Sequence, residues 1–222
     1  MQISSFISSI LLFLIGLPFA TAQSYTYQQI TTDSLKSGDL LFVGTSHVNL
    51  SGAIDRVTQT SVKTSFDHIA LIERTVDSVF VLHANSITGS IRESIEHFLK
   101  HEVEKDRKLV IYRLKHKYQH SIPNAITVAK TWLGKPYNTS YILNDSTLYC
   151  SDFVERAFRN DHIFQLEPMT FVNPKTGQID DFWKKHYQQL EIEVPEGLPG
   201  CNPNGMAASD KLKLVGELSK EH

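Results

Sequence analysis

Two short apolar runs joined by a brief polar link constrain the fold of this chain more than any other feature. The first run is His68–Glu73 and the second is Val79–His83, and both are rich in aliphatic and β-branched residues. The link Thr75–Ser78 has the length of a hairpin connection. The pattern therefore predicts two neighbouring antiparallel strands, with a histidine at the start of the first and another near the end of the second.

The rest of the chain shows strand and helix signals in blocks, which is typical of the α+β class. Short apolar runs predict two further strands, at Leu40–Val43 and Leu109–Leu114. Apolar residues at helical spacing predict helices over Ile91–His101, Pro123–Leu133, the residues from Cys150 onward and Gln178–Leu190. The Gly/Pro/Asn-rich stretch Pro195–Ser209 is expected to wrap the surface without regular structure.

The N-terminal segment predicts export. Ile7–Phe19 is an apolar stretch of about a dozen residues, and Ala20-Thr21-Ala22 follows it with the small-residue pattern of a signal-peptide cleavage site. We therefore expect residues 1–22 to be a signal peptide and residues 23–222 to form one mature domain. That domain is expected to work outside the cytoplasm, either periplasmic or secreted. The alternative, a buried N-terminal helix, is disfavoured by the cleavage pattern.

Composition limits the partners of the mature domain. Lys plus Arg number 22 and Asp plus Glu 24, a net charge of -2, so the basic excess typical of nucleic-acid binding is missing. No later run reaches the roughly 18 apolar residues that a membrane helix needs, so no stable membrane insertion is expected. The sequence leaves the oligomeric state open.

The chemistry is expected to centre on Cys150, which lies where a loop becomes a helix. Unpaired N–H groups and the positive end of the helix dipole stabilise a thiolate there, so the position predicts an activated nucleophile. A cysteine nucleophile also needs a proton acceptor and a group that orients it. On adjacent antiparallel strands, His68 and His83 can lie side by side, with His68 as the general base and His83 holding its orientation.

Three alternatives remain open on residue chemistry alone. The chain has two cysteines, so Cys150 and Cys201 could form a disulfide in an exported protein. Either histidine could be structural. Cys150, His68 and His83 could also be zinc ligands with a bound water, although no established zinc spacing supports this.

Six short motifs follow one another along the mature chain: Ser37–Phe42, Phe66–Ile72, Val81–Ala84, Leu133–Tyr137, Tyr149–Val154 and Pro199–Gly205. Each is individually weak, but the six in this order are specific. The chain resembles the circularly permuted branch of the NlpC/P60 superfamily, the YiiX/YaeF-like, papain-like amidases. In ordinary members the cysteine helix precedes the histidine strand, whereas here His68 precedes Cys150 by 82 positions, which matches the permuted order.

The resemblance implies a permuted papain-like α+β fold, in which the nucleophile helix packs against a small antiparallel sheet or open barrel. It implies that Cys150 is the nucleophile and His68 the base. His83 matches the third polar position, where this branch often has a glutamate. A neutral histidine stabilises an imidazolium less than a carboxylate would, so this departure puts the orientation and basicity of His68 in question.

Three further residues are candidates for substrate contact: Tyr149 and Asp67, which flank the catalytic pair, and Tyr137, which follows a proline in a loop. Ordinary packing and solvation are the alternative for each.

The resulting hypothesis is an exported cysteine amidase or peptidase that cleaves an amide bond in a small peptide or cell-wall peptide through a thioester. It needs no metal and no organic cofactor. A second hypothesis keeps the chemistry but moves or hydrolyses the acyl group of a lipid or N-acyl amide. A third is a non-catalytic binding domain with a Cys150–Cys201 disulfide.

Overall fold

The two apolar runs form β3 (Phe66–Arg74) and β4 (Val79–Asn85), which pair antiparallel from Leu71 opposite Leu82 to Arg74 opposite Val79. This confirms the predicted hairpin. The computed structural model describes residues 27–46, 49–58, 60, 65–103 and 106–219. The predicted signal peptide, residues 1–22, lies outside the described residues.

β3 and β4 belong to a seven-stranded sheet with the order β1-β11-β6-β2-β3-β4-β5. Neighbouring strands run antiparallel except for β1 and β11, which are parallel. The other strands of this sheet are β1 (Gln29–Ile30), β2 (Leu40–Gly44), β5 (Gly89–Ser94), β6 (Leu109–Leu114) and β11 (Leu212–Leu218).

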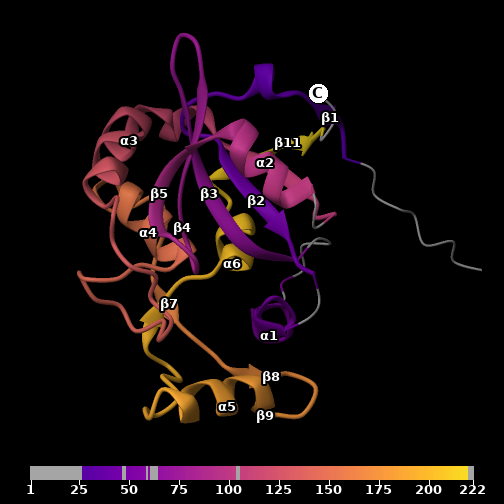
Figure 1. Ribbon diagram of the computed structural model, residues 1–222, viewed down its shortest axis with the longest axis vertical. Coiled ribbons are helices and arrows are strands. Elements are labelled where there is room, and N and C mark those ends of the chain that lie inside the picture. Colours follow the sequence, from indigo (N-terminus) through magenta and orange to yellow (C-terminus); the bar gives the residue numbers. More distant parts are fainter. Residues whose placement is uncertain (1–26, 47–48, 59, 61–64, 104–105, 220–222) are drawn as a thin grey trace, which may run out of the picture.

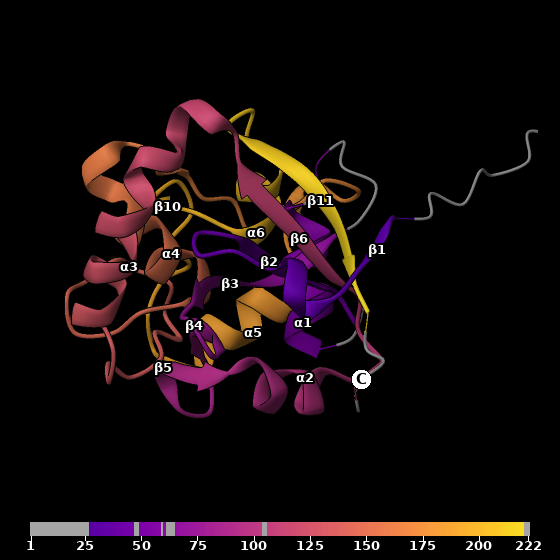
Figure 2. The same cartoon turned by 90° about the horizontal axis from the view of Figure 1, so that it is seen from above.

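Helices cover both faces of the sheet, and α2 lies on the opposite side from α6 (Figures 1 and 2). One core, on the face of α3, α4 and α6, contains side chains such as Phe66, Leu71 and Phe153. The other core, on the face of α2, contains side chains such as Ala70 and Val81. The helices are α2 (Ile95–Val103), α3 (Ile122–Thr131), α4 (Cys150–Phe158) and α6 (Pro203–Ala207). The α+β prediction and its antiparallel sheet are therefore confirmed.

A third, aromatic cluster lies beside this sheet, toward the bottom of Figure 1. It contains side chains of α1 (Asn49–Thr58) and α5 (Asp181–Gln189) together with Tyr141, Tyr149 and Phe171. An Arg56–Asp180 ion pair joins the two helices at the N-cap of α5. The short elements are β7 (Glu167–Pro168), β8 (Val172–Asn173), β9 (Gln178–Ile179), β10 (Pro199–Gly200), and the 3-10 helices η1 (Thr32–Ser34), η2 (His116–Ser121) and η3 (Arg159–Asp161). No helix among the described residues is long and apolar enough to cross a membrane.

The prediction of a helix over Ile91–His101 is wrong in its first part. Ile91 to Ser94 belong to β5, which pairs with β4, and α2 begins only at Ile95. The start of β5 is fixed from outside the segment: Ser90 N–H donates to the carbonyl of Lys135, and a Cβ on Gly89 would lie 2.2 Å from that oxygen. Tertiary pairing here outweighs the local helical spacing.

The prediction that Pro195–Ser209 lacks regular structure is also wrong. Asn202 caps α6 by accepting from Gly205 N–H. Asn204 is buried, and its side-chain oxygen accepts from Phe66 N–H at 2.6 Å. The tail therefore holds the first residue of β3, close to the predicted catalytic residues.

Candidate active site

Cys150 is the first residue of α4, as predicted. The side chain of the N-cap residue Tyr149 makes no capping hydrogen bond, so it leaves the first N–H groups of the helix directed at the site. All nine residues of α4 are buried, and Cys150 is 4% exposed. The nucleophile candidate is thus fixed at the end of a helix that is enclosed along its whole length.

The sulfur of Cys150 lies against the backbone of β3 on both sides of His68. Its Sγ is 4.0 Å from the carbonyl oxygen of Asp67, and the N–H of Ile69 donates to it. This contact falls just beyond the stretch where β3 and β4 pair, which begins at Leu71. The N-terminus of α4 therefore packs beside β3 where its pairing with β4 has ended.

Burial raises the pKa of the Cys150 thiol to about 11, although hydrogen bonds from the N–H groups of Ile69 and Ser151 lower it. The N–H groups at the helix N-terminus therefore act in the predicted direction but do not outweigh the effect of burial on the thiol. The loss of water around the sulfur costs the anion more than the nearby N–H groups return. A base must remove the proton when the sulfur reacts.

His68 and His83 lie side by side, as predicted from the hairpin. The Nε2 atom of His68 and the Nδ1 atom of His83 are 2.8 Å apart, and both rings contact Phe98 of α2. The imidazoles therefore lie on the α2 side of the sheet, whereas Cys150 belongs to the core on the other side. The sulfur of Cys150 contacts the backbone of the two residues that flank His68, Asp67 and Ile69.

Glu93 lies behind His83 and was not among the residues predicted from the sequence. Its Oε1 atom is 2.7 Å from His83 Nε2, and its Oε2 atom bonds to Nδ1 of His97 on α2. Burial alone would raise the pKa of Glu93, but these two hydrogen bonds outweigh it and lower the pKa below its usual value. Glu93 could have been identified only if the pairing of β5 with β4 had been recognised, because that pairing places Glu93 beside His83.

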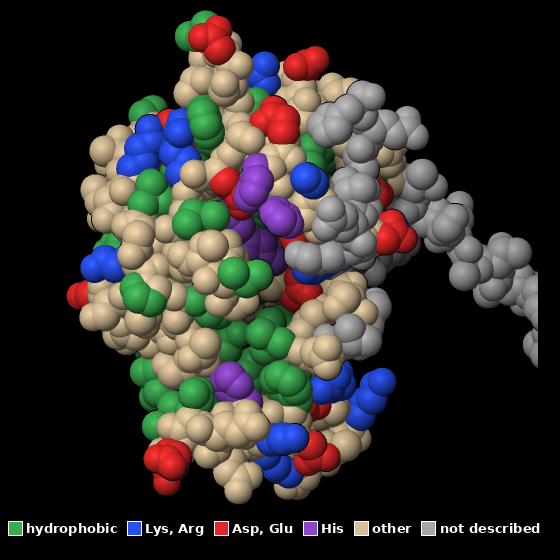
Figure 3. Space-filling model, in the orientation of Figure 1, with side chains coloured by type: hydrophobic (Ala, Val, Ile, Leu, Met, Phe, Trp, Pro, Cys, Tyr) green, Lys and Arg blue, Asp and Glu red, His purple; other side chains and the backbone are tan. Residues whose placement is uncertain are grey.

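A cavity of about 670 Å³ has Cys150 in its wall. His68 and His83 are not among the described residues that line it. Its lining is mixed: it includes apolar side chains such as Val57, Phe171 and Trp183 and polar ones such as Asp67, Asn202 and Lys211. Figure 3 shows histidine side chains grouped in the middle of one face, above a hollow bordered by hydrophobic side chains.

The three predicted substrate-binding residues all line this cavity. Asp67 is held by an ion pair with Arg107, and the hydroxyl of Tyr149 accepts from Cys201 N–H at 3.2 Å. Tyr137 and Tyr141 hydrogen-bond to each other, and burial raises the pKa of both, so their hydroxyls remain protonated. Tyr141, which was not predicted from the sequence, is buried and has a φ of 58°, which is unusual for a non-glycine residue.

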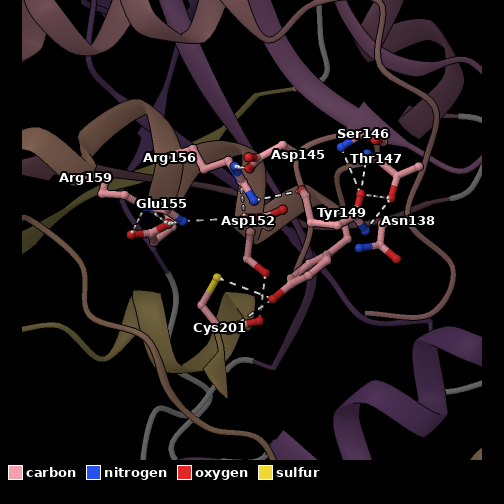
Figure 4. A network of polar contacts seen from close by, with 12 residues as sticks. Asn138, Asp145, Ser146, Thr147, Tyr149, Asp152, Glu155, Arg156, Arg159 and Cys201 are labelled. Carbon is pink, nitrogen blue, oxygen red and sulfur yellow. Dashed lines mark hydrogen bonds and ion pairs between the residues drawn. The ribbon is translucent and has the colours of Figure 1, made fainter. Parts of the chain in front are cut away.

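A network of arginines and carboxylates joins residues of α4 to one another and to the loop before the helix (Figure 4). Arg156 bonds to Asp152 at 2.8 Å and to Asp145 at 2.7 Å, and Arg159 bonds to Glu155. Asp152 is fully buried, and its Oδ2 atom has no hydrogen-bond partner among the described residues. Burial raises the pKa of Asp152 to about 6, although Arg156 lowers it.

Cys150 and Cys201 are both free thiols. The sulfur of Cys201 lies 3.9 Å from the hydroxyl of Tyr149. The disulfide required by the binding-domain hypothesis is therefore not formed in this structure. Among the described residues, no group of three or more His, Cys, Asp or Glu side chains is arranged to hold a metal ion.

A cysteine at the start of a buried helix, packed against a sheet that carries two paired histidines, defines a papain-like arrangement in permuted order. Residues 34–216 match the model of a family described as permuted papain-like amidase enzymes, YaeF/YiiX, family C92. The chain therefore belongs to the C92 family of permuted papain-like amidases.

Comparison with solved structures agrees on the fold. The chain is similar to the crystal structure of the metalloprotein YiiX from Escherichia coli O157:H7, with a TM-score of 0.62 and 20% sequence identity. The similarity covers 81% of this chain and 96% of that one. No curated protein gives a match.

Proposed function

We propose that the protein is an exported cysteine amidase that cleaves an amide bond in a small peptide or cell-wall peptide. The observation that supports this best is the position of the Cys150 sulfur. It lies at the uncapped N-terminus of α4, beside the backbone that carries His68, and in the wall of a cavity. Cys150 is the proposed nucleophile and His68 the proposed base, with His83 bonded to its Nε2 atom.

In this proposal the resting nucleophile is the neutral thiol, because its pKa is about 11. As Sγ attacks the carbonyl carbon of the amide, its proton moves to Nδ1 of His68, since His83 engages Nε2. For this step the imidazole has to approach Sγ past the end of the β3–β4 pairing, where the sulfur contacts the backbone of β3. The new C–S bond leaves a negative charge on the carbonyl oxygen. Backbone N–H groups at the start of α4 stabilise this oxyanion.

Collapse of this intermediate breaks the C–N bond, and the proton on His68 moves to the leaving amine. The acyl group then remains on Cys150 as a thioester. A water molecule gives one proton to His68, attacks the thioester carbonyl and releases the acid, and His68 returns the proton to the sulfur. Every step uses groups of this chain and water.

The test is to trap the acyl-enzyme. The protein is mixed with a panel of aminoacyl aminomethylcoumarins, with and without a free amino group, quenched in acid and weighed intact. We expect coumarin release and an acyl adduct that hydroxylamine removes, both lost in Cys150→Ala and kept in Cys201→Ala. An adduct that persists in Cys150→Ala would contradict the proposal.

The neutral state of the thiol has its own test. The rate of Cys150 alkylation by iodoacetamide in Cys201→Ala should rise about tenfold for each pH unit between pH 7 and 10, because only the thiolate reacts. A rate that is already constant below pH 7 would instead indicate a preformed thiolate–imidazolium pair. Cys150→Ser is the control for other sites of alkylation.

The apolar part of the cavity lining supports the second hypothesis for the acyl part of the substrate. Aromatic and aliphatic side chains line part of the space beside Cys150, and apolar surface of this kind binds apolar groups. A series of N-acyl aminomethylcoumarins from acetyl to dodecanoyl keeps the leaving group constant. A kcat/KM that rises with chain length would favour a lipid or N-acyl amide, and one that falls would favour the peptide substrate.

We also propose that the mature protein is periplasmic or secreted. The support is the apolar stretch and A-x-A pattern before Gln23. Expression of the full chain in a Gram-negative host should give a periplasmic protein whose N-terminal residue is Gln23. A protein that keeps Met1 and stays in the cytoplasm would contradict this.

A further inference from the structure

Three polar side chains from three adjacent strands form a continuous hydrogen-bonded chain. His68 on β3 bonds to His83 on β4 at 2.8 Å, and His83 bonds to Glu93 on β5 at 2.7 Å. The side chains of His83 and Glu93 are 4% and 13% exposed. Val81 is the residue opposite Glu93, so Glu93 and His83 are diagonal neighbours on one face of the sheet.

The chain ends at the surface on α2. The second oxygen of Glu93 bonds to His97, whose side chain is 62% exposed, and the ring of His101 lies 4.7 Å from that of His97. The titratable groups that face Glu93 are thus His83 from β4 and His97 from α2. Both hydrogen bonds favour the ionised carboxylate and lower the pKa of Glu93.

The direction of each hydrogen bond follows from Glu93. An ionised carboxylate only accepts, so His83 must carry its proton on Nε2. The Nδ1 atom of neutral His83 is then an acceptor, and His68 must donate to it from Nε2. Neutral His68 therefore has its basic lone pair on Nδ1.

We propose that Glu93 is a positioning residue that acts on Cys150 chemistry through His83 and His68; this rests on the proposed amidase mechanism. Glu93 selects the tautomer in which Nδ1 of His68 is the base. Its negative charge also stabilises the imidazolium that forms when the thiol loses its proton. Without Glu93, His83 can carry its proton on Nδ1, which would leave the lone pair of His68 on Nε2.

This position supplies the carboxylate that the sequence lacks at residue 83. His83 occupies the third polar position, and Glu93 places a carboxylate one hydrogen bond farther from the base. The site thereby keeps a negative charge, which is separated from His68 by the imidazole ring of His83. A histidine at position 83 and an acid at position 93 thus act as one unit.

The test compares Glu93→Ala, Glu93→Gln and the control Glu96→Gln, which removes one carboxylate charge from the exposed side of α2. Long-range proton–nitrogen NMR spectra of the imidazoles report each tautomer without any substrate. Turnover of the best coumarin amide gives kcat and KM separately, and urea unfolding gives the stability of each variant.

We expect His68 and His83 of the wild-type protein to be protonated at Nε2. Glu93→Ala should give mixed tautomers and lower kcat by about 10- to 100-fold with little change in KM, as is usual for groups that orient reacting residues. Glu93→Gln should keep the tautomers, because its amide oxygen still accepts from His83, and should lose less kcat. Glu96→Gln should match the wild type.

Unchanged tautomers and kcat in Glu93→Ala would overturn the proposal. A loss of activity that only follows the unfolded fraction would do the same, and Glu93→Gln decides the matter if the alanine variant does not fold. If the wild type cleaves no amide yet shows the expected tautomers, which change in Glu93→Ala, the amidase proposal fails and the positioning role of Glu93 stands.

Discussion

Two polar networks flank Cys150, and they are built from different chemistry. On one side, His68, His83, Glu93 and His97 form a chain of single hydrogen bonds from the interior to the surface. On the other side, arginines and carboxylates of α4 and the loop before it form the network drawn in Figure 4. The cationic groups of the first network are imidazoles, which exchange protons near neutral pH, and those of the second are guanidinium groups, which stay charged.

The difference separates two tasks at one site. A group that must accept and return a proton within a catalytic cycle needs a pKa near the working pH, and imidazole has one. A group that must hold a fully buried helix in place needs a permanent charge and several fixed donors, and arginine has them. We therefore expect substitutions in the histidine chain to change turnover and substitutions in the arginine network to change stability.

The largest effect should come from the reacting residues themselves. Cys150→Ala should abolish turnover, and His68→Ala should lower kcat by about 10³-fold or more, since one removes the nucleophile and the other the base. Both variants should unfold at nearly the wild-type urea concentration. Full coumarin release by Cys150→Ala would exclude the mechanism.

The arginine network should show the opposite pattern. Arg156→Ala removes the closest ion-pair partner of the buried Asp152, which otherwise has only Arg159 at 3.9 Å among the described residues, and should lower the free energy of unfolding by about 3–5 kcal/mol at pH 7.5. Lys184→Ala is the control for the loss of an exposed ion pair, because Lys184 and its partner Asp181 are 52% and 98% exposed, and this loss should cost about 1 kcal/mol or less. Urea unfolding measures both. An Arg156 variant that keeps its stability but loses kcat would contradict the assignment of stability to the arginine network and turnover to the histidine chain.

Asp152 gives the network a pH dependence with a defined sign. Burial raises its pKa from 3.8 to about 6, so the folded state holds this proton more tightly than the unfolded chain. Asp152 therefore favours folding below pH 3.8, and that contribution is lost as the pH rises through about 6, a change of about 3 kcal/mol.

Asp152→Asn removes this titration. The stability of the wild type relative to this variant should fall between pH 4 and pH 6.5, as measured by urea unfolding across that range. A difference that is independent of pH would show that Asp152 stays ionised in the folded protein. That result would make its pair with Arg156 as permanent as the other ion pairs of the network.

The sequence predicted the parts of this site that depend on local signals. The hairpin that brings His68 to His83 follows from two apolar runs and a short link, and the start of α4 at Cys150 follows from helical spacing. The burial that raises the thiol pKa could not be predicted, because it comes from segments distant in the sequence that close over α4.

Glu93 and β11 were missed for the same physical reason. Ile91, Ile95 and Phe98 satisfy a helical spacing, so Glu93 was assigned to a helix, whereas pairing with β4 makes that segment a strand. In β11, Lys213 and Glu217 interrupt the apolar pattern, and the strand forms through pairing with β6. In both cases the partner strand, and not the segment itself, determines the conformation.

The smallest expected effect on turnover is that of His83→Ala. It is also the most informative about the histidine network, because it tests whether His68, His83 and Glu93 act as one unit. His83→Ala should lower kcat about 10- to 100-fold, less than His68→Ala, since the base remains but loses its orienting partner. With His83 absent, Glu93 no longer reaches His68, so adding Glu93→Gln to His83→Ala should cost almost nothing further. Steady-state kinetics of the single and double variants measure this coupling. Additive losses in the double variant would show that Glu93 acts on the site by a route other than His83.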